Sequence, residues 1–400
     1  MQPLKGVRIL DLTTINPFTD TEFSDYGAEV IKVERPGSGD SIRDYPPFKD
    51  GVSVYHCYTD RGKKSITLNL RSDEGKEILK ELVKDADVLV ENFKAGTMEK
   101  MGLGYEELAK INPALVYGKL SSYGNVGPQK NYIAYDIAVQ AQTGIMDVTG
   151  YPDDEPSRVG CYVSDHLSCT YLGTAIVMAL YHAKRTGQGQ RVEVSMFEAV
   201  LSVMGEKVAS LNCGEQASRT GHLHDAYAPY DILPCKDGYV ALAVTTDAQW
   251  QAFCNAFEKS GWAADSRYAE NETRRANYLG SLRDELITLF AGKSRQEIEA
   301  RCCEAGVPAG PVNTMEEAIN SLQIEARRMM PLVPDQRIGD VVTVGKVIRY
   351  GEETEPDVFT TAPLLGQDTA EIIGQVLLRQ GVAADTVDER LQALTEQGVI

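Results

Sequence analysis

The chain has 400 residues, of which 43% are hydrophobic and 24% charged, and its formal net charge is −18. This length is typical of two or three domains, and the composition is that of a folded protein. A nucleic-acid-binding protein usually carries a basic surface, and this acidic chain shows no sign of one. No run of about 18 apolar residues predicts a membrane-spanning helix.

Strand and helix patterns alternate through the first half of the chain. Buried strands are expected at residues 6–12, 28–34, 65–70, 87–93 and 115–124, with helical patterns between them at 19–27, 72–86 and 104–112. This alternation predicts an α/β fold with a parallel sheet of the Rossmann type. A long helix over 166–184 follows, and then a strand that runs into a further helix.

The pattern changes near residue 225. Asp237-Gly238 is a turn signal between two strand-like runs, so a hairpin is expected there, and helical patterns follow it. We therefore place a smaller α+β domain at residues 225–325.

The sequence contains neither a secretion signal nor a cysteine motif for a metal. The N-terminus runs straight into the first strand and lacks a signal-peptide core, so a cytoplasmic protein is expected. The eight cysteines are scattered, without a CxxC pair or a Cys/His cluster at zinc spacing. Reduced thiols and no metal site are therefore expected.

Two segments carry groups that suit phosphate. "VERPGSGDSIR" (33–43) follows a strand, but its spacing is not the dinucleotide fingerprint, and no Walker A sequence occurs. Reactions driven by ATP or NAD are therefore disfavoured, and spacing alone favours a flexible surface loop. "DRGKK" (60–64) is basic and suits phosphate, although the pattern alone favours a solvated entrance to the next strand.

An isolated carboxylate, Asp165, lies at the start of the long helix, and the next acidic or basic side chain other than histidine is Lys184. Pattern alone favours a helix cap over catalysis by about two to one. The two roles are compatible, because the positive end of a helix favours an ionised carboxylate and such a carboxylate in a cleft is a nucleophile. We discount a triad with His166, because neighbouring helix side chains diverge and no GxSxG elbow occurs.

Ordered motifs run along nearly the whole chain, among them "YGAEVIKVERPGSGDSIR", "DVLVENFKAGTMEKMGLGYEEL", "SRVGCYVSDHLSCTYLGTAIVMALYHAKRTGQGQ" and "APLLGQDT". Together they resemble the class III CoA-transferase family, the formyl-CoA and carnitine CoA-transferase group. The resemblance implies a large Rossmann-like CoA-binding domain from residues 1–224 and 326–400, with the small domain inserted. It also implies an interlocked homodimer, acyl-CoA thioesters and organic acids as substrates, no permanently bound cofactor, and no nucleic-acid or membrane partner.

The same resemblance assigns roles to individual residues. Asp165 is expected to be the catalytic nucleophile, which passes through a mixed anhydride and an aspartyl-CoA thioester. The expected supporting residues are Asp136, Tyr135 and Asn16. The CoA contacts carried over by position are Arg35, Asn92, Lys100 and Arg61.

Three departures from the family pattern bear on the substrate. α-Methylacyl-CoA racemases, the alternative activity, resemble this chain but pair a His with the Asp, and that His falls at Tyr135. A tyrosine is a weak base near neutral pH, so racemisation is disfavoured. "TTINPF" (13–18) lacks the usual Ala-Gly step, and the glycine-rich active-site loop of formyl-CoA transferases is absent. Oxalate is therefore disfavoured, and the acid itself stays open.

Overall fold

The structure, a computed structural model, describes residues 2–15, 22–351 and 357–400. The chain divides into two compact units, one of residues 1–145, 159–206 and 322–400, the other of 146–158 and 207–321. These divisions lie near the predicted domain boundaries at 225 and 325, which stay a prediction.

A six-stranded parallel sheet forms the centre of the first unit. Its strands, in spatial order, are β5 (Lys64–Thr67), β2 (Glu29–Glu34), β1 (Arg8–Asp11), β6 (Val88–Glu91), β7 (Val116–Ser121) and β8 (Arg191–Ser195). Counted along the chain within this sheet, the order is 3-2-1-4-5-6, as in doubly wound dinucleotide-binding sheets. The predicted parallel α/β architecture is therefore confirmed.

Helices cover both faces of this sheet. Neighbouring strand residues such as Ile9 and Leu10 belong to different hydrophobic clusters, because successive side chains point to opposite faces. This double burial explains why the strands are continuously apolar. The helices of the first unit are α1 (Glu22–Asp25), α2 (Val54–Thr59), α3 (Asp73–Val83), α4 (Thr97–Lys100), α5 (Tyr105–Ile111), α6 (Asp136–Gln142), α8 (Val163–Thr186), α9 (Met196–Ser202), α17 (Leu322–Ala326), α18 (Thr369–Arg379) and α19 (Val387–Glu396).

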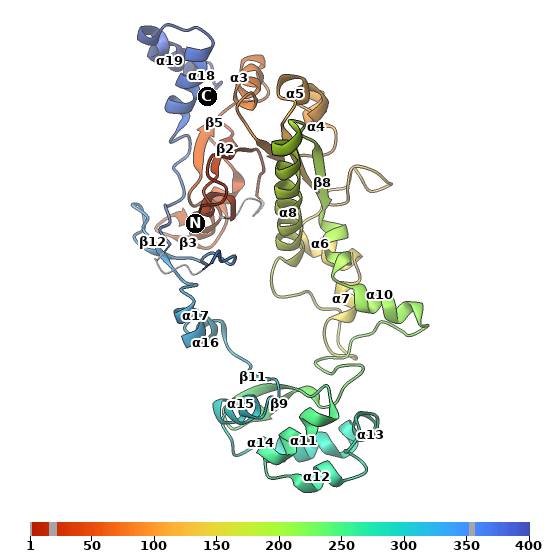
Figure 1. Cartoon of the computed structure of the whole chain (residues 1–400). Helices are drawn as coiled ribbons and strands as arrows, with labels where there is room; N and C mark the ends of the chain where they lie inside the picture. The colour runs from red at the N-terminus through yellow and green to blue at the C-terminus, as the bar shows by residue number, and fades with distance from the viewer. Residues whose placement is uncertain (1, 16–21, 352–356) are drawn as a thin grey trace. The chain divides into compact units, whose positions relative to one another are not determined.

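Both ends of the chain contribute to the same core. Ile373 on α18 packs in one cluster with Leu79 on α3 and Leu89 on β6. The backbone N–H of Asn69 donates to the carbonyl of Val399 at 2.8 Å. Figure 1 shows α18 and α19 beside α3 and β5, at the edge of the sheet. The C-terminal segment from Thr369 onward therefore completes a face that the N-terminal half leaves open.

The long helix α8 covers the opposite face. Leu172, Ile176 and Ala179 recur at helical spacing and pack against β6 and β7. A Cβ at Gly118 on β7 would lie 3.0 Å from the Ile176 side chain, so this glycine permits the close approach. The helix ends at Gly187, whose φ of +72° suits a glycine C-cap.

The second unit has its own core. An antiparallel sheet of β9 (Tyr230–Cys235), β10 (Gly238–Ala243) and β11 (Ala309–Pro311) confirms the predicted hairpin. Leu233, Trp250 and Phe290 are among its fully buried side chains. Its helices include α11 (Asp247–Ala256), α12 (Ser260–Ala264), α13 (Asn271–Asn277), α14 (Arg283–Phe290), α15 (Arg295–Glu304) and α16 (Met315–Ile319), and the short α7 (Ile145–Val148) and α10 (Gly205–Asn212) begin where the units divide.

No helix of the described residues is both long enough and apolar enough to cross a membrane.

Candidate active site

Asp165 lies in the first turn of α8, at its third residue. The sequence favoured a capping role for this side chain, and that interpretation is wrong. The helix begins at Val163, three residues earlier than predicted, so Tyr162 occupies the cap position and makes no capping hydrogen bond. Asp165 is therefore inside the helix and does not occupy its N-cap position.

The charge that acts on Asp165 is another carboxylate, that of Asp136 on α6. Asp136 is 5% exposed, and its Oδ1 accepts hydrogen bonds from the Ser164 backbone N–H at 2.9 Å and from the Ser164 hydroxyl at 2.8 Å. Burial, with a smaller contribution from Asp136, raises the pKa of Asp165 from 3.8 to about 7. The attraction of the helix N-terminus for an anion is therefore outweighed by lost hydration and by a like charge.

His166 is not placed as a triad partner. Its ring is exposed, and burial of part of the ring lowers its pKa. No hydrogen bond or ion pair joins it to Asp165 among the described contacts. The discounted triad therefore gains no support from this geometry.

A pair of tyrosines next to Asp165 was missed by the sequence analysis. The hydroxyls of Tyr45 and Tyr162 lie 2.8 Å apart, which joins the loop after β2 to the start of α8. This hydrogen bond, with burial and the Asp165 charge, raises the pKa of Tyr45. Tyr45 also packs on Tyr55, with ring centroids 5.5 Å apart. These residues are 117 positions apart in sequence, so no local spacing indicated the contact.

Two of the predicted CoA contacts, Arg35 and Lys100, have charged side chains that are open to solvent. Arg35 follows β2 and Lys100 ends α4, and both side chains are exposed. Neither makes a hydrogen bond or an ion pair within the part of the chain that the structure describes. Both cations are therefore accessible to a phosphate.

Arg61 has a different environment. Its guanidinium is fully buried, pairs with Asp25 at 2.6 Å and donates at 2.7 Å to both the Thr343 hydroxyl and the Val344 carbonyl. It also stacks on Phe359, 4.4 Å from the ring centroid. The solvated strand entrance favoured by the pattern is thus wrong for this residue, and the contacts favour a structural role over the predicted CoA contact.

Three predicted residues remain: Asn92, Asn16 and Tyr135. The Asn92 amide accepts from the Thr14 N–H at 3.0 Å and donates to the Thr14 carbonyl at 2.9 Å, so it fixes the chain just before residue 16. Asn16 itself lies outside the described residues. Tyr135 occupies the N-cap position of α6 without a side-chain capping hydrogen bond and is 70% exposed.

A buried cluster of charges supports the loop after β1. Lys32 pairs with Asp40 at 2.8 Å, and Lys63 pairs with Asp60 at 2.7 Å and with Asp11 at 3.2 Å. Although burial opposes ionisation, the two ammonium groups hold the pKa of Asp60 well below its usual range. The loop at 33–43 is likewise ordered, because Arg43 binds Glu34 through two nitrogens at 2.7 and 2.6 Å. The spacing favoured a flexible surface loop at 33–43; Arg35, Gly37 and Ser38 are exposed, whereas Arg43 ties the end of the segment back to β2.

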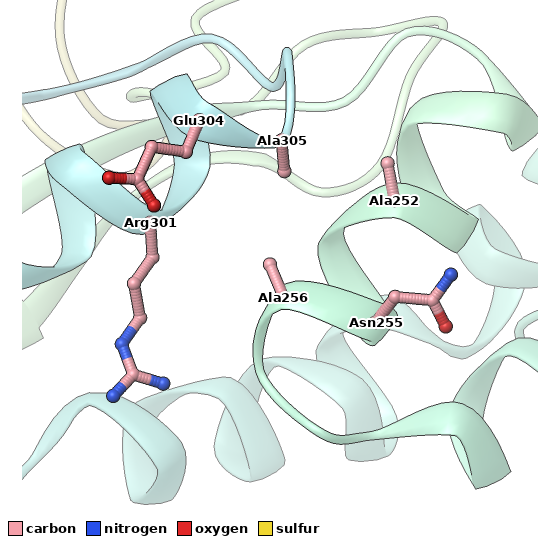
Figure 2. A pocket seen from close by; sticks show the side chains of 6 residues that line it. All are labelled: Ala252, Asn255, Ala256, Arg301, Glu304 and Ala305. Atoms are coloured by element: carbon pink, nitrogen blue, oxygen red, sulfur yellow. The ribbon is translucent and has the colours of Figure 1, made fainter.

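Separate from these residues, the second unit has a shallow hollow of about 390 Å³ between α11 and α15 (Figure 2). Alanine side chains line much of it, with Asn255, Arg301 and Glu304 at its edge. None of the sequence-predicted site residues lines this hollow.

The model of CoA-transferase family III matches residues 4–369. An acetyl-CoA:oxalate CoA-transferase of Acetobacter aceti is 36% identical, over 92% of this chain and 95% of that protein. A succinyl-CoA:glutarate CoA-transferase of Mus musculus is 33% identical, over 94% and 87%.

A solved structure has the same fold. The crystal structure of a CAIB/BAIF family protein from Brucella suis superposes with a TM-score of 0.81 at 34% identity, covering 94% of this chain and 99% of that one. Sequence and fold agree over almost the full length, which confirms the resemblance found in the motifs. The chain therefore belongs to CoA-transferase family III and is an enzyme of the CoA-transferase class.

Proposed function

We propose that this enzyme moves CoA from an acyl-CoA thioester to a free organic acid through covalent intermediates on Asp165. The observation that carries the proposal is the position of Asp165, a half-buried carboxylate in the first turn of a long helix. The N–H groups of a first helical turn have no intrahelical acceptors. In α8 the Val163 N–H donates to the Cys161 carbonyl and the Ser164 N–H donates to Asp136. The Asp165 N–H is therefore the group of this turn that is suited to stabilise an oxyanion beside the carboxylate.

The reaction has two symmetrical halves. The Asp165 carboxylate attacks the acyl carbonyl carbon, the C–S bond breaks, and a mixed anhydride and CoA thiolate form. The thiolate attacks the Asp165 carbonyl of that anhydride and releases the donor acid, leaving an aspartyl-CoA thioester. The acceptor carboxylate then repeats these two steps in reverse and regenerates Asp165. Each thioester replaces another, so ATP is not required.

The raised pKa of Asp165 suits this chemistry. A carboxylate of higher proton affinity is a stronger nucleophile, yet it must be ionised to attack. A pKa of about 7 leaves roughly half of the enzyme in the reactive form at neutral pH.

CoA binding is assigned to exposed cations of the first unit. Arg35 and Lys100 are accessible for the phosphates, and the Arg side chain offers a bidentate fork that Lys lacks. Asn92 stays in the proposal as a residue that fixes the loop leading to Asn16 and the acyl group. The contacts of Arg61 do not support a place among the CoA ligands.

We further propose that the protein is a cytoplasmic homodimer. Each chain then has one large Rossmann-like domain and one small α+β domain. The outward face of α8 supports the dimer, because Tyr171, Val177, Met178 and Tyr181 are each at least 43% exposed. An apolar face of this kind on a long helix is typical of an interface. The interlocked arrangement and the boundaries 1–224, 225–325 and 326–400 belong to the same proposal.

The acceptor is proposed to be a small dicarboxylic acid. Relatives at 32–36% identity are named for oxalate, glutarate, mesaconate and citramalate. The oxalate-named relative stands against our expectation from the missing glycine-rich loop, so oxalate belongs in the acceptor panel. Racemisation stays disfavoured, because Tyr135 replaces the histidine that would serve as second base.

The test is a donor and acceptor screen with mass spectrometry of the CoA products. The wild-type enzyme is expected to form a new acyl-CoA only when an acceptor acid is present, and Asp165→Ala is expected to form none. Asp153→Ala, which removes an exposed carboxylate twelve residues earlier, is the matched control and retains activity. Hydroxylamine added during turnover should convert Asp165 to a hydroxamate. Full turnover by Asp165→Ala would refute the nucleophile assignment.

A further inference from the structure

Two side chains of α6 hold the chain segment that enters α8. Asp136 and Gln140 are one helical turn apart, so both face the same side. Asp136 Oδ1 accepts both the N–H and the hydroxyl of Ser164. Gln140 Oε1 accepts the Val159 N–H at 2.9 Å, and its Nε2 donates to the Cys161 carbonyl at 3.4 Å.

The two side chains also bind each other. Gln140 Nε2 donates to Asp136 Oδ2 at 2.7 Å, which closes the network. Gln140 is fully buried and Asp136 almost so, and each of their four polar side-chain atoms has a partner. A buried network with every member satisfied is rigid and specifies one arrangement.

This network replaces a cap that α8 lacks. Tyr162 at the cap position makes no side-chain hydrogen bond to the helix, so the Ser164 N–H in the first turn needs an acceptor from outside the helix. The Asp136 carboxylate supplies the acceptor from a different helix. Residues 149–162 have no helix or strand of their own, so the position of the first turn depends on contacts of this kind.

We propose that Asp136 and Gln140 form a clamp on residues 159–164 and act as positioning residues that fix the Asp165 carboxylate for attack on the thioester carbon. The inference rests on the proposed role of Asp165 as nucleophile. Gln140 has no charge, and among the described residues its side-chain hydrogen bonds go to Asp136, Val159 and Cys161 and none to Asp165, so its effect on catalysis passes through the backbone. Misplacing a reacting group by about 1 Å costs on the order of a hundredfold in rate.

The experiment compares two single variants and a swap. Gln140→Leu keeps the approximate volume and removes three hydrogen bonds. Gln140→Glu places a second carboxylate against Asp136. Asp136→Asn combined with Gln140→Glu restores a complementary pair, in which the new amide donates to the new carboxylate and still accepts from Ser164. The net charge of the swap equals that of the wild type.

Gln140→Leu is expected to lower kcat by roughly tenfold to a hundredfold, with the KM for the acyl-CoA donor changed less than about threefold. The swap is expected to recover at least about tenfold over Gln140→Glu alone, because the hydrogen bond between positions 136 and 140 and the contacts to Ser164 and Val159 are made again. The long hydrogen bond to the Cys161 carbonyl is not restored. Gln142→Leu, an exposed glutamine on the same helix, is the matched control and retains wild-type kcat. A wild-type kcat in Gln140→Leu, or a swap no better than Gln140→Glu, overturns the clamp.

Hydrogen exchange separates this proposal from the proposed function. The amides of Val159 and Ser164 are expected to exchange slowly in the wild type and at least about tenfold faster in Gln140→Leu, while the middle of α8 is unchanged. If the wild type transferred no CoA, the proposed function would fail, and the exchange rates would still decide the clamp. Equal exchange in both proteins would refute it whatever the activity.

Discussion

The carboxylate pair at the start of α8 predicts how activity depends on pH. The pKa of Asp165 is raised from 3.8 to about 7, first by burial and then by Asp136. Only the ionised form attacks, so kcat/KM should rise with pH and level off above about 7. At pH 6 roughly a tenth of Asp165 is ionised, and at pH 5 roughly a hundredth. Activity should fall by the same factors.

The perturbation is Asp136→Asn. It removes the like charge and leaves burial in place, so the acidic limb should move to lower pH without reaching 3.8. Tyr45, Tyr162 and His166 also adjoin Asp165, and each is retained in this variant. The value of kcat/KM on the plateau above pH 7 reports the loss of the Asp136–Gln140 clamp. The pH at the midpoint of the acidic limb reports the effect of the Asp136 charge on Asp165, so the two effects are measured separately.

The assay is kcat/KM from pH 5 to 9 in buffers of constant ionic strength. CoA carries a phosphate monoester that titrates near pH 6, so a dephospho-CoA donor is the control. A limb that persists with that donor belongs to the enzyme. A wild-type profile that is flat between pH 5 and 8 would refute the assignment to Asp165. An unmoved limb in Asp136→Asn would refute the contribution of Asp136.

Three further outcomes are expected. Asp165→Asn should abolish transfer but stabilise the protein as pH rises. The raised pKa means that the folded state resists ionisation of Asp165, and that cost grows through the window from about 4 to 7. By proton linkage, the free energy of unfolding of Asp165→Asn relative to that of the wild type should increase by about 2–3 kcal/mol between pH 5 and 8, as measured by urea unfolding. A difference between the two proteins that does not change with pH would contradict this expectation. Arg35→Ala should raise the KM for CoA donors by roughly tenfold, since a charge-assisted hydrogen bond contributes about 1.5–3 kcal/mol, whereas the exposed Arg71→Ala should not; equal KM values in wild type and Arg35→Ala would place the nucleotide elsewhere. With a 2-methylacyl-CoA in deuterium oxide and no acceptor, no deuterium should enter the α position, because Tyr135 replaces the second base; exchange at the rate of normal turnover would favour the racemase.

The sequence predicted the parallel sheet because its strands are apolar on both faces, and it predicted the long helix within three residues of its start. It located Asp165 by isolation in an otherwise uncharged stretch. It did not predict the capping partner, because Asp136 is 28 residues away from Ser164 and belongs to a separate helix. Only the packing of α6 against α8 brings the two together.

The basic segment at 60–64 shows why local pattern misjudged the charges. Lysines and arginines are rarely buried unless paired, and the segment itself contains three cations and one acid, so a solvated surface was the natural interpretation. Apart from Asp60, which pairs with Lys63 inside the segment, the partners come from elsewhere. Asp11 at the end of β1 pairs with Lys63, Glu29 on β2 with Lys64, and Asp25 from α1 with Arg61. Removing one member of such a buried group leaves an uncompensated charge and costs about 3–5 kcal/mol. These charges therefore hold the loops after β1 and β2, and their place in the fold follows from strand order, which no five-residue window contains.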